Sequence, residues 1–209
     1  METADKTEQK DRISGAAFEL FCQRSIKGVS MDDIAQHLAI SKKTIYKWFD
    51  NKNEIVIAAV SDYLNKMEHT ACDFSDAANA VEELFELVKM SRQIFSQLNQ
   101  GIFYELQKYH PEAWELWIKH KNEFTLKKIK TNLLRGISEG LFRKDLDIEV
   151  MARLRLAQIE IPFNKNVFPP HEYELTRVQM ASLEHYMLGI ATLKGHKLIN
   201  NLKHITEEE

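Results

Sequence analysis

Apolar residues recur at the spacing of an α-helix along most of this chain, and this periodicity limits the folds that it can adopt. In the first such segment Ile13, Ala16, Ala17, Leu20 and Phe21 form one apolar stripe. Alternating runs of β-branched residues, which are typical of strands, are almost absent. Only seven glycines and four prolines interrupt the 209 residues. The sequence therefore predicts an all-α protein.

Local start signals divide the chain into about nine helices. Ser30 and Asp33 have the spacing of a capping box, Ser41 can cap the next helix, and Asn51 with Glu54 has the spacing of a second capping box. Four short to medium helices in the first 70 residues predict a compact unit. Longer helices are expected over about 76–98, 100–109, 111–140, 147–161 and 170–202.

The distribution of charge requires any contact with a polyanion to be local. The whole chain has 28 basic and 31 acidic residues, a net charge of −3. Residues 24–52, in contrast, contain six basic and three acidic residues, a local charge of +3. The net charge excludes binding of a polyanion by the chain as a whole, but a basic patch within residues 24–52 could still bind one.

Several classes of protein find no support in the sequence. Two cysteines provide neither a disulfide framework nor a four-ligand zinc site. The first ten residues are polar, and no run approaches the roughly 18 apolar residues of a membrane span. There is no phosphate loop, dinucleotide fingerprint or nucleophile elbow. We expect a soluble, cytoplasmic protein without catalytic residues, metal or cofactor.

The helix that begins at Lys42 places cations at its N-terminus. With Ile45, Trp48 and Phe49 facing inward, the side chains that face outward are Lys42, Lys43, Tyr46 and Lys47. A helix N-terminus attracts anions, so an external anion such as DNA phosphate would stabilise this arrangement. Lysine can also reach guanine acceptors in the major groove. Two helices joined by a three-residue turn are typical of a helix-turn-helix, although lysine pairs are often ordinary surface.

The order of residues over about 10–56 is more specific than this composition. The positions concerned are Arg12, Ile13, Ala16, Ala17, Leu20, Phe21, Gly28, Ser30, Ile34, Ala35, Ser41, Thr44, Ile45, Tyr46, Phe49, Lys52 and Glu54. This pattern resembles the N-terminal DNA-binding domain of the tetracycline-repressor (TetR) family. The chain departs from the family pattern at Ala39, which replaces a glycine in the turn, at Lys43, which replaces a small residue, and at Trp48, which replaces a tyrosine or histidine. Asp32 is in addition an unexplained acid.

The resemblance implies nine DNA-binding residues: Ser30, Met31, Ser41, Lys42, Lys43, Thr44, Tyr46, Lys47 and Lys52. Ser30 and Met31 would lie close to the DNA backbone. The first turn of the following helix would enter the major groove, and Lys52 would hold a phosphate. It also implies three parts: a polar tail over 1–9, a helix-turn-helix domain over 10–56, and a ligand-binding and dimerisation domain over 57–209.

Aromatic residues concentrate in the first half of that C-terminal part. The candidates for lining a pocket are Phe95, Phe103, Tyr104, Trp114, Trp117 and Phe124. Aromatic residues at helical spacing more often belong to the core. Tyr104, Trp114 and Trp117 are favoured as pocket residues because their polar atoms need partners when buried. Such a pocket would suit an apolar or aromatic small molecule.

One broad side of the last helix predicts a dimer interface. Its residues are Leu183, Tyr186, Met187, Gly189, Ile190, Ala191 and Lys194. The resemblance implies that this helix and the one at 147–161 pair with their twins across a two-fold axis. The alternative is that this face packs inside its own subunit.

Together these features predict a ligand-responsive transcriptional regulator, in particular a repressor. We expect a homodimer that binds a palindromic operator in double-stranded DNA and is released by a small-molecule effector. The alternative is an all-α carrier or interaction protein that keeps the fold without sequence-specific DNA binding. An α-helical enzyme ranks far below both.

Overall fold

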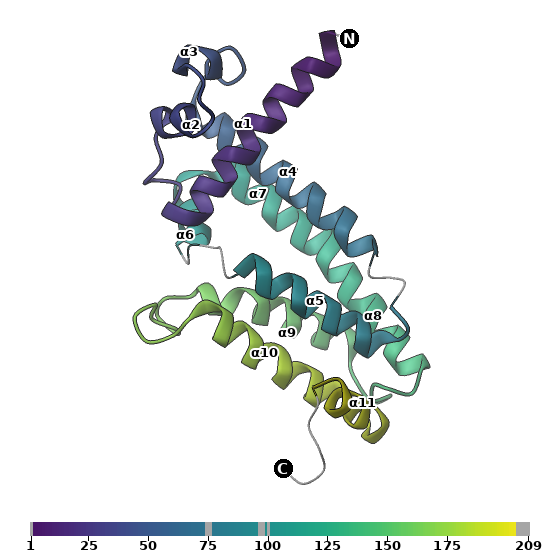
Figure 1. Ribbon diagram of the computed structural model, residues 1–209. Coiled ribbons are helices and arrows are strands. Elements are labelled where there is room, and N and C mark those ends of the chain that lie inside the picture. Colours follow the sequence, from purple (N-terminus) through teal and green to yellow (C-terminus); the bar gives the residue numbers. More distant parts are fainter. Residues whose placement is uncertain (1, 74–76, 96–98, 100, 204–209) are drawn as a thin grey trace. The chain divides into compact units, whose positions relative to one another are not determined.

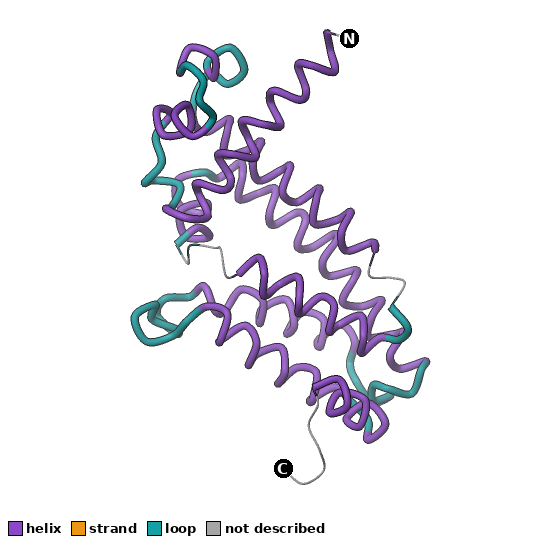
Figure 2. The backbone as a smooth tube through the Cα atoms, in the orientation of Figure 1, coloured by secondary structure: helices purple, strands orange, loops and turns teal. Residues whose placement is uncertain are grey.

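The computed structural model describes residues 2–73, 77–95, 99 and 101–203. Helices account for most of this part of the chain, in which the structure has no strand and one isolated β-bridge, between Phe142 and Ala191 (Figures 1 and 2). The all-α prediction is confirmed. No helix among the described residues is both long enough and apolar enough to cross a membrane.

The helices form two compact units. Unit 1 comprises residues 1–70 and 97–120, and unit 2 comprises residues 71–96 and 121–209. Unit 1 contains α1 (Glu2–Arg24), α2 (Met31–His37), α3 (Lys42–Ile45), most of α4 (Lys52–Asp73), α6 (Ile102–Tyr109) and α7 (Pro111–His120). The predicted polar tail is helical from Glu2 onward, because its residues favour helix and extend α1.

Unit 1 has its own apolar core. The most deeply buried side chains of α1 to α4 are Ile13, Ala17, Ile34, Ile45, Ile55 and Val56. Ile102 and Leu106 of α6 and Ala113 of α7 join the same cluster. Of the predicted inward residues, Ile45 of α3 and Phe49 beyond its end are buried and Trp48 is partly buried, and they hold this short helix against its neighbours. The predicted boundary at residue 56, between a DNA-binding domain and a ligand-binding and dimerisation domain, stays a prediction.

Unit 2 contains α5 and the C-terminal helices. Its elements are α5 (Ala80–Phe95), a π-helical turn (Lys121–Thr125), α8 (Leu126–Ser138), α9 (Ile148–Glu160), a 3-10 turn (Ile161–Phe163), α10 (Leu175–Ile190) and α11 (Leu193–Lys203). Residues such as Val81, Leu133, Phe142, Ala152 and Ile190 form its core.

The last predicted helix is two helices in the structure. Ala191 adopts an extended conformation between α10 and α11. Here Arg143 donates its backbone N–H to Ile190, and Thr192 donates to Leu141, each at 2.9 Å. This long-range pairing interrupts the helix. The expected helix over 111–140 is likewise divided, into α7 and α8, by the π-helical turn, so the described residues contain eleven α-helices against about nine expected.

Candidate nucleic-acid interface

The start of α2 is fixed by a capping box. Ser30 Oγ accepts a hydrogen bond from the backbone N–H of Asp33 at 3.1 Å, and Asp33 Oδ2 accepts one from the N–H of Ser30 at 2.8 Å. The hydrogen bonds from Ser30, with the nearby Arg24 guanidinium, lower the pKa of Asp33. Ser30 is exposed, whereas Met31 is buried in the core. Of this predicted DNA-binding pair, Ser30 alone lies at the surface.

The turn between α2 and α3 contains the strained residue that the sequence indicated. Ala39 has a φ of 53°, in the left-handed region that favours glycine. Ile40 donates its N–H to the Ala35 carbonyl at 3.0 Å, and Ala39 donates to Gln36 at 3.1 Å. These bonds terminate α2 in the manner of a Schellman motif. The turn redirects the chain so that α3 starts at Ser41.

Helix α3 presents its first turn to solvent. Ser41 Oγ accepts from the Thr44 N–H at 3.0 Å and caps the helix. Beyond Ile45 the chain continues as a turn, in which Trp48 and Phe49 donate to the Ile45 carbonyl. Ser41, Lys42, Lys43, Tyr46 and Lys47 are exposed, and Thr44 is half-buried. The structure thus brings six of the nine predicted DNA-binding residues together on and beside one short helix.

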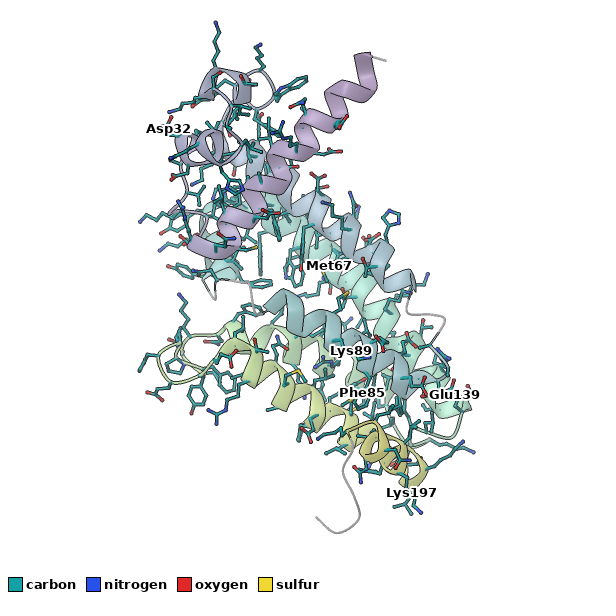
Figure 3. All side chains as sticks on the ribbon, viewed as in Figure 1. Asp32, Met67, Phe85, Lys89, Glu139 and Lys197 are labelled. Atoms are coloured by element: carbon teal, nitrogen blue, oxygen red, sulfur yellow. The ribbon has the colours of Figure 1, made fainter. Side chains whose placement is uncertain are left out.

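Asp32 has a partner across this surface. Lys42 Nζ donates to Asp32 Oδ2 at 2.8 Å, joining α3 to α2. This hydrogen bond raises the pKa of Lys42. Asp32, labelled in Figure 3, is the acid that the sequence could not explain. It holds one of the two leading lysines of α3 in place, and it must release that lysine if an external anion is to bind there.

Lys52 takes a different position from the other predicted DNA contacts. Its Nζ donates to the carbonyl of Ile26 and lies 5.9 Å from the centre of the Phe21 ring. Partial burial lowers the pKa of Lys52, although Glu105 and Asp33 act in the opposite direction. Lys52 therefore ties the start of α4 to the loop after α1 in this structure.

Two further cations of α1 reach the same region. Arg12 Nη2 donates to the Leu38 carbonyl at 3.4 Å, and Lys10 Nζ lies 5.6 Å from the centre of the Phe49 ring. Both residues are exposed. The sequence reasoning did not select them as site residues, since it counted charge only from residue 24. Their position directly before the first apolar stripe is the sequence feature that could have identified them.

The predicted pocket residues fall into separate groups. Phe103, Trp114 and Trp117 form an aromatic cluster in unit 1, with Phe103 centred 5.0 Å from Trp117 and 6.3 Å from Trp114. Tyr104 does not join them: its side chain is 54% exposed and accepts a hydrogen bond from Lys108 at 2.7 Å. Phe124 belongs to unit 2. The side chain of Phe95 lies outside the described residues.

The predicted dimer face of the last helix is mostly interior. Its buried members are Leu183, Tyr186, Met187, Ile190 and Ala191, which pack in the core of unit 2. These five residues favour the alternative, in which the apolar side of α10 packs within its own subunit. Gly189 and Lys194 are exposed, and Lys194 Nζ donates to the Glu139 carbonyl at 3.0 Å.

Helix α9 has an apolar stripe that the sequence reasoning missed. Val150 and Leu154 are each 51% exposed, and Ile161 follows after a further seven residues. Ala157, also exposed, lies between them. The spacing of four, three and four residues is that of one helix face. This spacing could have been read from the sequence, but its exposure could not.

The chain is similar in sequence to known regulators over part of its length. The family described as "Bacterial regulatory proteins, tetR family" matches residues 13–59. The HTH-type transcriptional regulator YvaF of Bacillus subtilis is 30% identical over 105 residues, which cover 49% of this chain and 55% of YvaF. The HTH-type transcriptional repressor KstR2 of Mycobacterium tuberculosis is 28% identical over 141 residues, 66% of this chain and 70% of KstR2.

Similarity to solved structures extends over nearly the whole chain. A transcriptional regulator from Saccharomonospora viridis, solved in complex with choline, has a TM-score of 0.70 at 19% identity. The alignment covers 89% of this chain and 99% of that protein. At this identity the likeness shows the fold alone, whereas the sequence of YvaF aligns over little more than half its length. With the helix-turn-helix on α2 and α3, the match at residues 13–59 shows that the N-terminal part of the chain is similar to the TetR family of bacterial regulatory proteins.

Proposed function

We propose that this chain is a cytoplasmic transcriptional repressor that binds a palindromic operator as a homodimer and is released by a small molecule. The observation that carries this proposal is the exposed first turn of α3, where Lys42 and Lys43 follow the cap at Ser41. A capped helix with outward cations at its N-terminus fits the major groove of DNA.

In the proposed complex, Lys42, Lys43 and Thr44 contact base edges while neighbouring groups hold the backbone. Tyr46 and Lys47 contact phosphates, as do Ser30 and the exposed cations Lys10 and Arg12. Lys42 exchanges the carboxylate of Asp32 for DNA. Lys52 reaches a phosphate only if its Nζ leaves the Ile26 carbonyl.

The exposed stripe of α9 supplies the proposed dimer contact. Val150, Leu154 and Ile161 would pack against their twins across a two-fold axis, together with the exposed small residues Ala181 and Gly189 of α10. A two-fold pair of α3 helices reads half-sites about one turn of DNA apart. This is why we propose a palindromic operator.

The relatives support repression and control by a ligand. KstR2 is a transcriptional repressor, and the regulator from Saccharomonospora viridis was solved with choline. Binding of an effector to unit 2 would shift the distance between the two copies of α3. Coupling between two such sites typically amounts to about 1–3 kcal/mol, which corresponds to roughly 5- to 150-fold weaker DNA binding.

Selection of genomic fragments with the purified protein, followed by titration of the recovered site at several salt concentrations, tests this function. We expect a palindromic site whose affinity falls steeply with salt. Lys43→Ala should weaken binding about tenfold or more and relax the base preference. Lys66→Ala, an exposed lysine of α4, serves as the matched control and should change little.

Failure to enrich any fragment at low salt would contradict the proposal. The protein would then be a carrier that keeps the fold. The ion pair between Lys42 and Asp32 and the inward position of Lys52 would in that case be permanent, and the surface of α3 would have no nucleic-acid partner.

A further inference from the structure

Arg155 of α9 lies in the interior of unit 2 without an anionic partner. The residue is 9% exposed, and its Nη1 has no hydrogen-bond partner. None of the ion pairs formed by the described residues includes it. Burying an unpaired guanidinium is costly, so proteins pair such groups or bind an anion beside them.

Both glutamates of α9 have a basic partner. Glu149 pairs with Lys130 at 2.6 Å, and Glu160 pairs with Lys121 at 2.8 Å. Lys130 belongs to α8, which packs alongside α9, and Lys121 belongs to the π-helical turn that precedes α8. Among the described residues of α9, neither arginine has an ion-pair partner, but Arg153 is exposed to solvent whereas Arg155 is buried, more deeply than either glutamate.

An aromatic, neutral side chain lies beside the guanidinium. The centre of the Tyr186 ring lies 5.3 Å from Arg155 Cζ, and Tyr186 is buried among apolar side chains that include Leu183 and Met187. Burial raises the pKa of Tyr186 to about 12, so its hydroxyl stays protonated. Burial also lowers the pKa of Arg155 to about 10, which leaves it cationic at neutral pH. The ring stabilises the cation without neutralising it.

A second unpartnered polar atom lies one turn along the same helix. Gln158 Oε1 is buried and accepts no hydrogen bond. Residues three apart share a helix face, so Arg155 and Gln158 present a donor and an amide on one side of α9. Rotation of the amide presents its NH₂ group instead, since oxygen and nitrogen are alike in shape.

We propose that unit 2 binds an effector with an apolar body and a single carboxylate, and that Arg155 holds the carboxylate with help from Gln158. The planar guanidinium matches the two carboxylate oxygens, and its single positive charge matches one negative charge. A phosphate monoester carries nearly twice that charge and would need a second cation. This inference rests on the proposed function and names the class of its effector.

Calorimetric titration of the purified full-length protein tests the proposal directly. The probes are decanoate and 4-phenylbutanoate, each matched with its uncharged alcohol, together with monodecyl phosphate and decyltrimethylammonium. We expect at least one carboxylate to bind about tenfold or more tightly than its alcohol. Arg155→Met should reduce that affinity about 10- to 100-fold, and Arg155→Lys should lose less, because the charge remains.

Arg153→Met provides the matched control, because Arg153 is an exposed arginine of the same helix. It should leave carboxylate binding unchanged. The melting temperature of ligand-free Arg155→Met should not fall below that of the parent protein, since the substitution removes an unpaired buried charge. A purely structural arginine would give the opposite result, with a lower melting temperature and weaker binding of every probe alike.

Three outcomes would overturn the proposal. They are equal binding of a carboxylate and its alcohol, tighter binding of monodecyl phosphate or decyltrimethylammonium, and no binding of either carboxylate. Failure of the proposed function would appear elsewhere, in the titration of operator DNA without any ligand. The two results are therefore distinguishable.

Discussion

Lys42 has two possible anionic partners, Asp32 of its own chain and the operator. The two side chains are joined at 2.8 Å on an exposed surface, where water and salt screen the attraction. DNA binding must therefore compete with a weak internal contact. Asp32 also places a negative charge beside the phosphates. Both effects oppose binding, and both end when the carboxylate is removed.

At this scale we predict that Asp32→Asn tightens operator binding by about threefold to tenfold, because one repulsive charge is lost and Lys42 is released. Fluorescence anisotropy with a labelled operator measures the change. Asp145→Asn is the control, since Asp145 is an exposed acid of unit 2. Unchanged or weaker binding by Asp32→Asn would mean that the pair orders Lys42 for its contact with DNA.

The turn between α2 and α3 stores strain at one residue. Ala39 has positive φ, while the hydrogen bonds from Ala39 and Ile40 hold the end of α2 in place. A left-handed conformation costs a residue with a Cβ about 1 kcal/mol relative to glycine. The core residues Ile34 and Ile45 on either side compensate for this cost.

Ala39→Gly should raise the free energy of unfolding by up to about 1 kcal/mol, less any entropy that glycine loses on folding. Chemical denaturation followed by circular dichroism gives the value. Ala58→Gly, in the middle of α4, should lower stability by about 1 kcal/mol. If both substitutions destabilised the protein alike, the turn would not have the conformation described.

The proposed dimer depends on a surface that the isolated subunit leaves exposed. The α9 stripe places Leu154 beside Val150 and Ala157, and none of these side chains is needed to fill the core of unit 2. Burying such apolar side chains between two subunits stabilises a dimer by about 25 cal/mol per Å² of apolar surface. A charge in the middle of the stripe should therefore separate the subunits without unfolding them.

Leu154→Glu should convert the dimer into a monomer and reduce operator affinity by at least about tenfold, since one α3 helix then binds alone. Light scattering after size-exclusion chromatography reports the mass. Leu134→Glu is the matched control, because Leu134 is 55% exposed on α8 and Leu154 is 51% exposed on α9. A dimer that survives Leu154→Glu, or that Leu134→Glu disrupts, would place the interface elsewhere.

Local signals in the sequence determined the structure of the proposed DNA-binding region. Each of its features depends on residues within about five positions in the chain. These features are the caps at Ser30 and Ser41, the outward lysines of α3 and the unusual backbone at Ala39. Hydrogen bonds of this range are encoded in the order of residues and form wherever the helix starts or ends. The all-α class follows in the same way from helical periodicity.

Tertiary structure alone decided what each apolar or charged face contacts. Helix α10 is apolar on a broad side, so its sequence could not tell whether Leu183 and Met187 face the core or a partner. The interruption at Ala191 results from pairing with residues 141–143, some fifty positions away. The unpaired charge of Arg155 is likewise invisible in sequence, because an arginine can reach water from most helix positions. Packing removes that water, and only the folded unit determines where.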